Sequence, residues 1–163
     1  IVDCARLSPS ARNMQPLRYV TISDQASCRT MFGMFVFGGA LSAAQRPTPE
    51  QMPRGYIAIT GPKATDPLSA IDIGIAAQSM FLKAGESGLG CCMLGAFNKQ
   101  KLAAFLGLPE ELETKLVLAF GTPAEKRKVV GRRPDGMLTY YRDENDEHCV
   151  PKLTREEVIL RSL

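Results

Sequence analysis

The 163-residue sequence contains one histidine, His148, and its five cysteines form no CxxC pair. A Ser-His-Asp triad needs an imidazole beside its nucleophile, and His148 instead lies next to a charged turn, so a triad is not expected. Zinc is not expected either, because the adjacent Cys91 and Cys92 cannot readily share one tetrahedral ion with Cys149. Five cysteines without framework spacing indicate a reducing compartment, and we expect a cytoplasmic protein.

Long apolar runs and a strong excess of one charge are also missing. The longest apolar run, residues 31–44, includes three glycines and is too short to cross a bilayer. The N-terminus shows no charged-then-apolar signal pattern. Twenty Lys and Arg against 17 Asp and Glu leave a net charge of +3, which is too weak and too scattered to predict nucleic-acid binding. Length and composition indicate one globular domain.

Turn residues divide the chain into short predicted elements. Pro9 ends a first helix, because it moves Ser8 out of the helical region. Glycines and prolines bound the later segments in the same way. The patterns predict the end of a helix over 1–7, a strand over 17–22, helical turns around 28–35, a surface loop over 45–54, a strand over 56–60, a helix over 66–84, a short apolar segment over 90–97, a helix over 99–106 and a strand over 115–120.

The predicted helix over 66–84 has the clearest signals. Asp66 can cap it, Pro67 suits its first position, and Ser69 with Asp72 resembles a capping pair. Its apolar residues fall on nearly every side, which is typical of a helix buried all round. In so small a chain, this pattern predicts that a partner subunit covers one face.

The last part of the chain, residues 122–163, is rich in charge. Within it, residues 137–142 and 147–150 flank Asp143–Asp146 and predict a hairpin. Alternating acidic and amide side chains there resemble the start of a calcium loop, but the required glycine and bidentate glutamate are missing, so a plain turn is expected. The segment lacks the apolar content for a core of its own, and we expect it to wrap around the body of the protein or around a second body.

Two segments are candidates for ligand binding. Ser8–Pro16 places hydroxyl, amide and guanidinium groups on a loop, where binding residues concentrate, although a plain polar connection has the same composition. Gly88–Phe97 is rich in small residues that let a flat ligand approach the backbone, although tight packing would need them too. Its glycines do not match the dinucleotide fingerprint, because they follow a helix and the third is displaced.

Taken in order, these segments resemble the nitroreductase family of FMN-dependent, NAD(P)H-using oxidoreductases. The resemblance covers nearly the whole chain, and four motifs in the correct order are more specific than any one of them. They are Ala5–Tyr19 (ARLSPSARNMQPLRY), Asp72–Met80 (DIGIAAQSM), Gly88–Phe97 (GLGCCMLGAF) and Leu118–Glu125 (LAFGTPAE), followed by the tail segments Tyr141–Asn145 and Val150–Lys152.

The resemblance implies an α+β fold with a central, mostly antiparallel sheet flanked by helices. It implies a single domain over 1–163, whose charged tail 122–163 wraps the partner of an intertwined homodimer with FMN at two interface sites. It further implies hydride transfer from NAD(P)H through flavin N5 to a nitroaromatic, quinone or related acceptor, by a ping-pong mechanism without a catalytic side chain. Two alternatives stay open: a non-catalytic or weakly flavin-binding dimer of this fold, and a specialised dehalogenating or flavin-processing relative.

The resemblance also assigns expected FMN contacts. Those in the loop, which reaches the flavin from the partner subunit, are Pro9, Ser10, Ala11, Asn13 and Gln15. Those beside the flavin ring are Met93, Leu94 and Gly95, with a backbone N–H directed at N5. Lys152 is expected to bind the phosphate, with Arg155 replacing a second basic residue where Leu153 stands. The family's basic N-terminal arm has no counterpart before Ile1, so the domain is expected to lack that arm.

Overall fold

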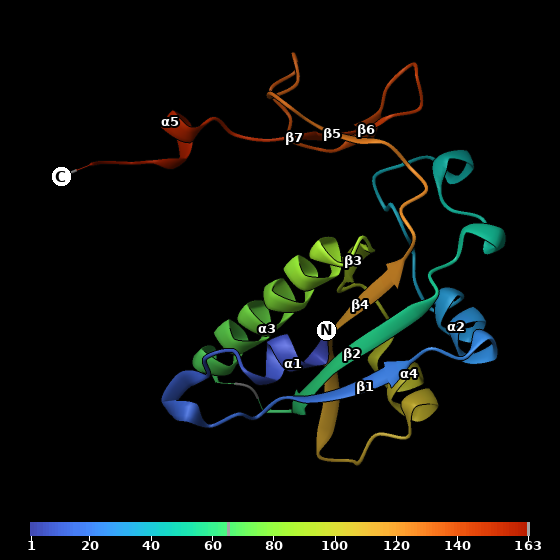
Figure 1. The fold of residues 1–163 in the computed structure, drawn as a ribbon, viewed down its shortest axis with the longest axis vertical. Helices are drawn as coiled ribbons and strands as arrows, with labels where there is room; N and C mark the ends of the chain where they lie inside the picture. The colour runs from blue at the N-terminus through green and yellow to red at the C-terminus, as the bar shows by residue number, and fades with distance from the viewer. Residues whose placement is uncertain (65, 163) are drawn as a thin grey trace. The chain divides into compact units, whose positions relative to one another are not determined.

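The computed structural model describes residues 1–64 and 66–162. The chain divides into two compact units, the first made of Ile1–Val36 and Thr48–Pro123, the second of Phe37–Pro47 and Ala124–Leu163. Figure 1 shows the elements of both units in chain order. The second unit is therefore assembled from an internal segment and the C-terminal part of the chain.

The first unit is built on an antiparallel sheet of four strands. The strands are β1 (Arg18–Ile22), β2 (Gly55–Pro62), β3 (Gly90–Leu94) and β4 (Leu112–Gly121). Their order across the sheet is β1-β2-β4-β3, and every neighbouring pair is antiparallel. The central antiparallel sheet and three of its strands are thus confirmed, and the apolar segment after Gly88 supplies the fourth strand at an edge.

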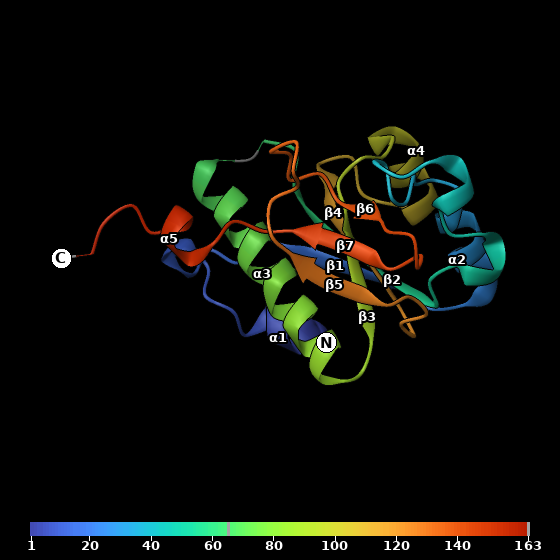
Figure 2. The same ribbon diagram turned by 90° about the horizontal axis from the view of Figure 1, so that it is seen from above.

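Helices cover both faces of this sheet. The short α1 (Val2–Arg6) and the long α3 (Pro67–Glu86) lie on one face, with α2 (Gln25–Phe32) and α4 (Lys99–Leu106) on the other (Figure 2). Alternate residues of a strand point to opposite faces, so Ile57 and Ile59 of β2 join the core under α3. Tyr56 points the other way and stacks on Phe35, with ring centroids 6.2 Å apart.

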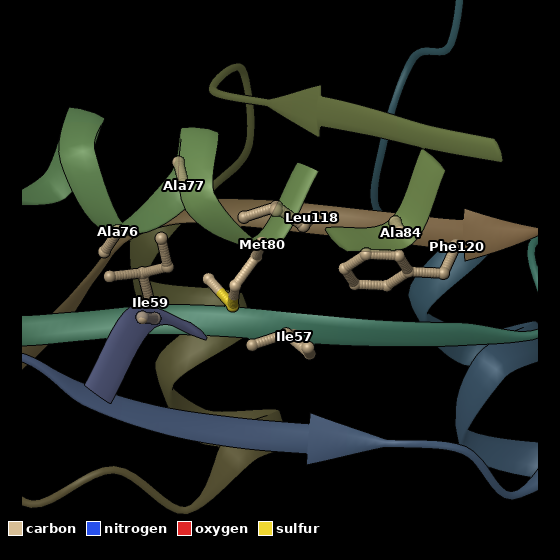
Figure 3. Packing of buried hydrophobic residues seen from close by; sticks show 9 residues of the cluster. Ile57, Ile59, Ala76, Ala77, Met80, Ala84, Leu118 and Phe120 are labelled. Carbon is tan, nitrogen blue, oxygen red and sulfur yellow. The ribbon is translucent and has the colours of Figure 1, made fainter. Parts of the chain in front are cut away.

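Met80 of α3 lies in the middle of the larger core. Figure 3 shows its side chain directed from the helix toward β2. The cluster around it is apolar throughout and consists of Ala5, Ile57, Ile59, Ala76, Ala77, Ala84, Leu118 and Phe120. These contacts fix α3 on the sheet and hence fix the position of every side chain that α3 presents.

The start of α3 agrees with the sequence in one respect and differs in another. Asp66 caps the helix, accepting hydrogen bonds from the backbone N–H of Leu68 at 2.8 Å and of Ser69 at 3.1 Å. The Ser69 hydroxyl also donates to Asp66, at 2.7 Å. The expected pairing of Ser69 with Asp72 is therefore wrong. The Ser69 hydroxyl donates its proton to Asp66, and the Asp72 carboxylate accepts hydrogen bonds from the loop before β1.

One side of α3 is apolar and not covered by this chain. Ala76, Ala77, Met80 and Ala84 are buried against the sheet. On the opposite side, Leu68, Ile71 and Leu82 are 45%, 57% and 64% exposed. We call Leu68, Ile71, Ile75 and Leu82 the open face of α3. That a partner subunit covers it stays a prediction.

The remaining short elements refine the sequence expectations. The helix predicted around 28–35 begins earlier, at Gln25, because Asp24 caps it by accepting from the Ser27 N–H at 2.8 Å. The predicted loop 45–54 contains a one-turn 3₁₀ helix, η3 (Pro49–Gln51), which follows η2 (Ala43–Gln45). The helix over 99–106 is confirmed and ends at Gly107, whose φ of 62° is left-handed.

The second unit has its own three-stranded sheet, of order β5-β7-β6. The predicted hairpin is confirmed by the antiparallel pairing of β6 (Tyr141–Arg142) with β7 (His148–Pro151), although its first strand is shorter than expected. The sequence does not predict β5 (Arg127–Val130), which pairs in parallel with β7. That this unit wraps a partner subunit stays a prediction.

Asp143 ties the turn of this hairpin together and makes it sensitive to acid. Its carboxylate accepts from Lys128 Nζ at 2.6 Å and from the backbone N–H of Asn145 and Glu147, both at 3.0 Å. The Lys128 hydrogen bond and these backbone N–H groups lower the pKa of Asp143 to about 2.

Because the folded pKa lies below the ordinary value of 3.8, ionised Asp143 stabilises the hairpin above about pH 4. We expect this stabilisation to be lost as the pH falls from about 4 to 2. NMR chemical shifts of residues 141–150 during an acid titration should show the change, and Asp143→Asn should remove it. A wild-type hairpin whose shifts stay constant over that range would contradict the assignment.

Candidate functional site

The loop between α1 and β1 carries the first group of predicted site residues. It passes through η1 (Ala11–Asn13) and rests on α3. Ser10 Oγ donates to Asp72 Oδ2 at 2.6 Å, and the Ala11 N–H donates to Asp72 Oδ1 at 3.1 Å. A second link joins the Ser8 hydroxyl to Ser79 Oγ at 2.8 Å. Two side chains of α3 therefore hold the loop along its length.

The exposed part of the loop presents polar groups. Gln15 Nε2 donates to Asn13 Oδ1 at 2.8 Å, which leaves the Asn13 amide NH₂ group directed away from that bond. Within residues 1–64 and 66–162, neither that NH₂ group nor the Arg12 guanidinium has a hydrogen-bond or ion-pair partner. Arg12 and Asn13 can therefore donate to an acidic or carbonyl-bearing ligand.

A shallow hollow of about 220 Å³ lies where the loop meets α3. Its lining consists of residues 9–11 of the loop and of Leu68, Ile71, Asp72 and Ile75 of α3. Three of these belong to the open face of α3. The hollow is thus an apolar surface with one carboxylate at its base, and that carboxylate is already engaged by the loop.

The second group of predicted residues lies at the end of β3. Leu94 is buried, Met93 is 37% exposed, and Gly95 is exposed. A Cβ built on Gly95 would meet only Leu116 Cδ1, at 3.9 Å. The space over the Gly95 backbone is therefore open to a flat ligand.

The two groups lie at the same end of the sheet but at opposite edges. Arg18, which follows the loop, pairs with Thr60, and Thr60 pairs with Thr114 of β4. Leu94 pairs with Val117, only three residues further along β4. Two strands separate the edges, which places them roughly 14 Å apart across the sheet. One chain does not bring the loop and Gly95 into a single pocket.

The predicted phosphate ligands belong to the second unit. Lys152 directly follows β7 and is exposed, and its backbone N–H donates to the Val130 carbonyl at 2.9 Å. Arg155 is exposed at the first position of α5 (Arg155–Val158). The two cations are therefore three residues apart on one surface segment, available to an anion.

Cys91 and Tyr19, two titratable side chains of the first unit, have raised pKa values. Burial, and then the neighbouring Cys92, raise the pKa of Cys91 to about 12, so the Cys91 thiol stays protonated and unreactive. Burial, followed by the negative charge of Asp72, raises the pKa of Tyr19. Among the residues that the structure describes, no cluster of three or more His, Cys, Asp or Glu side chains could hold a metal ion.

Across the described residues, no helix combines the length and the apolar composition needed to cross a lipid bilayer.

Gly95→Ala tests whether a ligand lies against the end of β3. The added methyl group meets no close neighbour, so we expect the melting temperature of the ligand-free protein to stay within about 1 °C, as for an exposed substitution. FMN affinity should fall about tenfold, because the methyl group enters the space that a flat ring would occupy. Fluorescence titration of FMN measures the change.

Gly131→Ala is the matched control, since a Cβ there meets nothing within 4 Å and the methyl group is accommodated as easily as at Gly95. It should bind FMN as the wild type does. Equal affinity of Gly95→Ala and wild type would remove β3 from the binding site.

Asp72 is a residue of the loop contact that sequence reasoning misses. Local patterns place it at the start of its own helix, whereas it lies six residues after the true cap, Asp66. A carboxylate on an otherwise apolar turn of α3, buried to 6% exposure, points to a tertiary partner. Its distance of 62 positions from Ser10 hides that partner from local patterns.

Comparison with known proteins identifies the family. The model of the nitroreductase family matches residues 1–122. The last segment of the first unit ends one residue later, at Pro123. A protein of Archaeoglobus fulgidus, provisionally named NADH dehydrogenase/NAD(P)H nitroreductase, is 25% identical over 134 residues, covering 78% of this chain and 72% of that protein.

Solved structures share the fold. A nitroreductase family protein from Clostridium difficile 630 has a TM-score of 0.59 at 24% identity, covering 76% of this chain and 69% of its own. An FMN-dependent nitroreductase from C. difficile R20291 has a TM-score of 0.59 at 21% identity, covering 77% and 74%. The family match spans most of the sequence, and the chain belongs to the nitroreductase family of oxidoreductases.

Proposed function

We propose that the protein is an FMN-dependent oxidoreductase. It would pass hydride from NAD(P)H to a nitroaromatic, quinone or related acceptor by a ping-pong mechanism, as a homodimer. The observation that carries the proposal is the open face of α3 beside the polar loop 8–15, in a chain of the nitroreductase family. The choice of cofactor is supported by the C. difficile R20291 relative, which is named an FMN-dependent nitroreductase.

The residues of the first unit fit the flavin ring of FMN in two respects. The open backbone at Gly95 accommodates a flat ring, with Met93 half-exposed beside it. The Arg12 guanidinium and the Asn13 NH₂ group, which have no partner among the described residues, suit the carbonyl groups of a flavin. In the second unit, taken by itself, the exposed cations Lys152 and Arg155 suit a phosphate group. Bound FMN would supply the hydride-transfer chemistry, and the protein residues would hold and orient it.

The protein's own residues bind and orient in this proposal. Loop donors and the end of β3 come from opposite edges of one sheet, so a homodimer in which the loop of one chain reaches β3 of the other would unite them. The open face of α3 would be buried in the same contact, which excludes water. No side chain acts as general acid or nucleophile. The five free cysteines favour a reducing compartment such as the cytoplasm.

The test is to purify the protein in its full natural length and to examine it for bound flavin. We expect a yellow protein that releases FMN on denaturation and that NADH or NADPH bleaches without oxygen. A quinone or nitroaromatic should then restore the colour, in two separable half-reactions. A colourless protein that takes up no added FMN would contradict the proposal. If FMN binds but neither NADH nor NADPH reduces it, the non-catalytic alternative is supported. Turnover with halogenated substrates only would support the specialised relative.

A further inference from the structure

The loop before β1 adopts a backbone that its own residues disfavour. Arg12, Asn13 and Gln15 have φ values of 51°, 56° and 48°, and none of them is glycine. Left-handed backbone is uncommon for such residues, and a segment holding three of them needs contacts from outside to persist. One such contact comes from β1, where Arg18 Nη1 donates to the Gln15 carbonyl at 2.9 Å, and the others come from Asp72 of α3.

Asp72 lies at the end of a hydrogen-bond chain that brackets these residues. The Gln15 N–H donates to Ser10 Oγ at 3.0 Å, and Ser10 Oγ donates to Asp72 Oδ2 at 2.6 Å. The other carboxylate oxygen accepts from the Ala11 N–H. The two ends of the left-handed segment are therefore tied to one buried carboxylate, on a helix that the core holds rigidly.

We propose that Asp72 is a positioning residue for the ligand-binding loop. It holds residues 10–15 in the left-handed conformation that presents Arg12 and Asn13 outward. This inference rests on the proposed function only for the identity of the ligand; the claim about loop conformation stands separately.

The geometry also changes the roles of two predicted contacts. The single hydroxyl proton of Ser10 and the backbone N–H of Ala11 are both given to Asp72, so neither is available as a donor to a ligand. Ser10 and Ala11 therefore contribute to binding by fixing the loop to Asp72 and not by contacting the ligand with these donors. Direct polar contact with the flavin is then left to Arg12, to the amide NH₂ group of Asn13 and to the side-chain carbonyl of Gln15, whose Nε2 donates to Asn13.

Cleavage by trypsin after Arg12 reports loop conformation without any cofactor. We expect Asp72→Asn and Ser10→Ala each to speed cleavage after Arg12 about tenfold relative to cleavage after Lys126, an exposed residue of the other unit. Asn keeps one acceptor oxygen but places an NH₂ group toward a donor, so one of the two bonds is lost. Ser10→Thr keeps the hydroxyl and should behave as wild type.

Ser79→Ala is the matched control on the same helix, because it removes a serine link to Ser8 that lies outside the left-handed segment. It should leave the cleavage ratio unchanged. In FMN titrations, Asp72→Asn and Ser10→Ala should weaken binding about tenfold, with the double variant no weaker than either single one. Melting temperatures show whether a variant is folded. If Asp72→Asn does not fold, Ser10→Ala alone decides whether the bond to Asp72 holds the loop.

Unchanged cleavage ratios in both variants would overturn the proposal. An equal rise in the cleavage rates after Arg12 and after Lys126 would also overturn it, because it indicates general destabilisation. The same holds if Ser10→Thr is cleaved after Arg12 as fast as Ser10→Ala. If the wild type binds no FMN, the proposed function fails, while the cleavage ratios still decide whether Asp72 holds the loop.

Discussion

Replacing Met80 by alanine should lower the free energy of unfolding by about 2–5 kcal/mol. The Met80 side chain is fully buried between α3 and the sheet, where Ile57, Ile59 and Leu118 surround it (Figure 3). Removing it costs the transfer of its apolar atoms and leaves a cavity that β2, paired on both sides, cannot close. Because the chain has no tryptophan, denaturation should be followed by far-UV circular dichroism at fixed protein concentration.

Met14→Ala makes the same chemical change at a residue that is 72% exposed in the same unit. We expect it to alter the unfolding free energy by less than about 0.5 kcal/mol. A Met80→Ala variant as stable as Met14→Ala would show that α3 does not pack on the sheet in this way.

Placing a lysine on the open face of α3 should break the proposed dimer. Ile71 and Leu82 are more than half exposed in the single chain, so Ile71→Lys or Leu82→Lys should leave the fold of each chain intact. In a dimer these positions would be buried, and an unpaired buried charge costs several kcal/mol. The dimer dissociation constant should therefore rise by about a hundredfold or more. Sedimentation velocity over a concentration series measures it.

FMN affinity should fall together with dimerisation, since the proposed site needs the loop of one chain and the β3 end of the other. Val36→Lys is the control, because Val36 is apolar and 61% exposed in the same unit but lies outside α3. If the α3 variants sediment as dimers, or if Val36→Lys dissociates as readily, the dimer contact lies elsewhere.

The sequence predicts well those elements whose signals are local. Asp66 and Pro67 mark the start of α3, and Gly107 marks the end of α4, because capping and left-handed glycines act within one turn. The family resemblance predicts the antiparallel sheet, which the structure confirms, whereas the site residues that it implies stay a prediction. Asp24 with Ser27 is a further local cap, and it explains why α2 begins earlier than its apolar pattern indicates.

Elements that depend on tertiary pairing are not predictable in the same way. β5 lies in a charged segment and is defined only by its parallel pairing with β7, 21 positions away at Arg127↔His148. β3 is rich in small residues, and its strand character comes from pairing with β4. The role of Asp72 requires knowing which loop crosses its helix turn. The side chains that shape the loop are therefore found only in three dimensions.

The discontinuous second unit limits how this protein can be shortened. A stop codon after Pro123 would delete its whole sheet yet keep residues 37–47, which would lose, among other contacts, the Tyr140 hydroxyl that accepts from the Ala40 N–H at 3.1 Å. A minimal version of the first unit would instead need residues 37–47 replaced by a short linker that joins Val36 to Thr48. A series of C-terminal truncations would thus measure the destabilisation caused by residues 37–47 without their partners. It would not show whether the four-stranded sheet folds on its own.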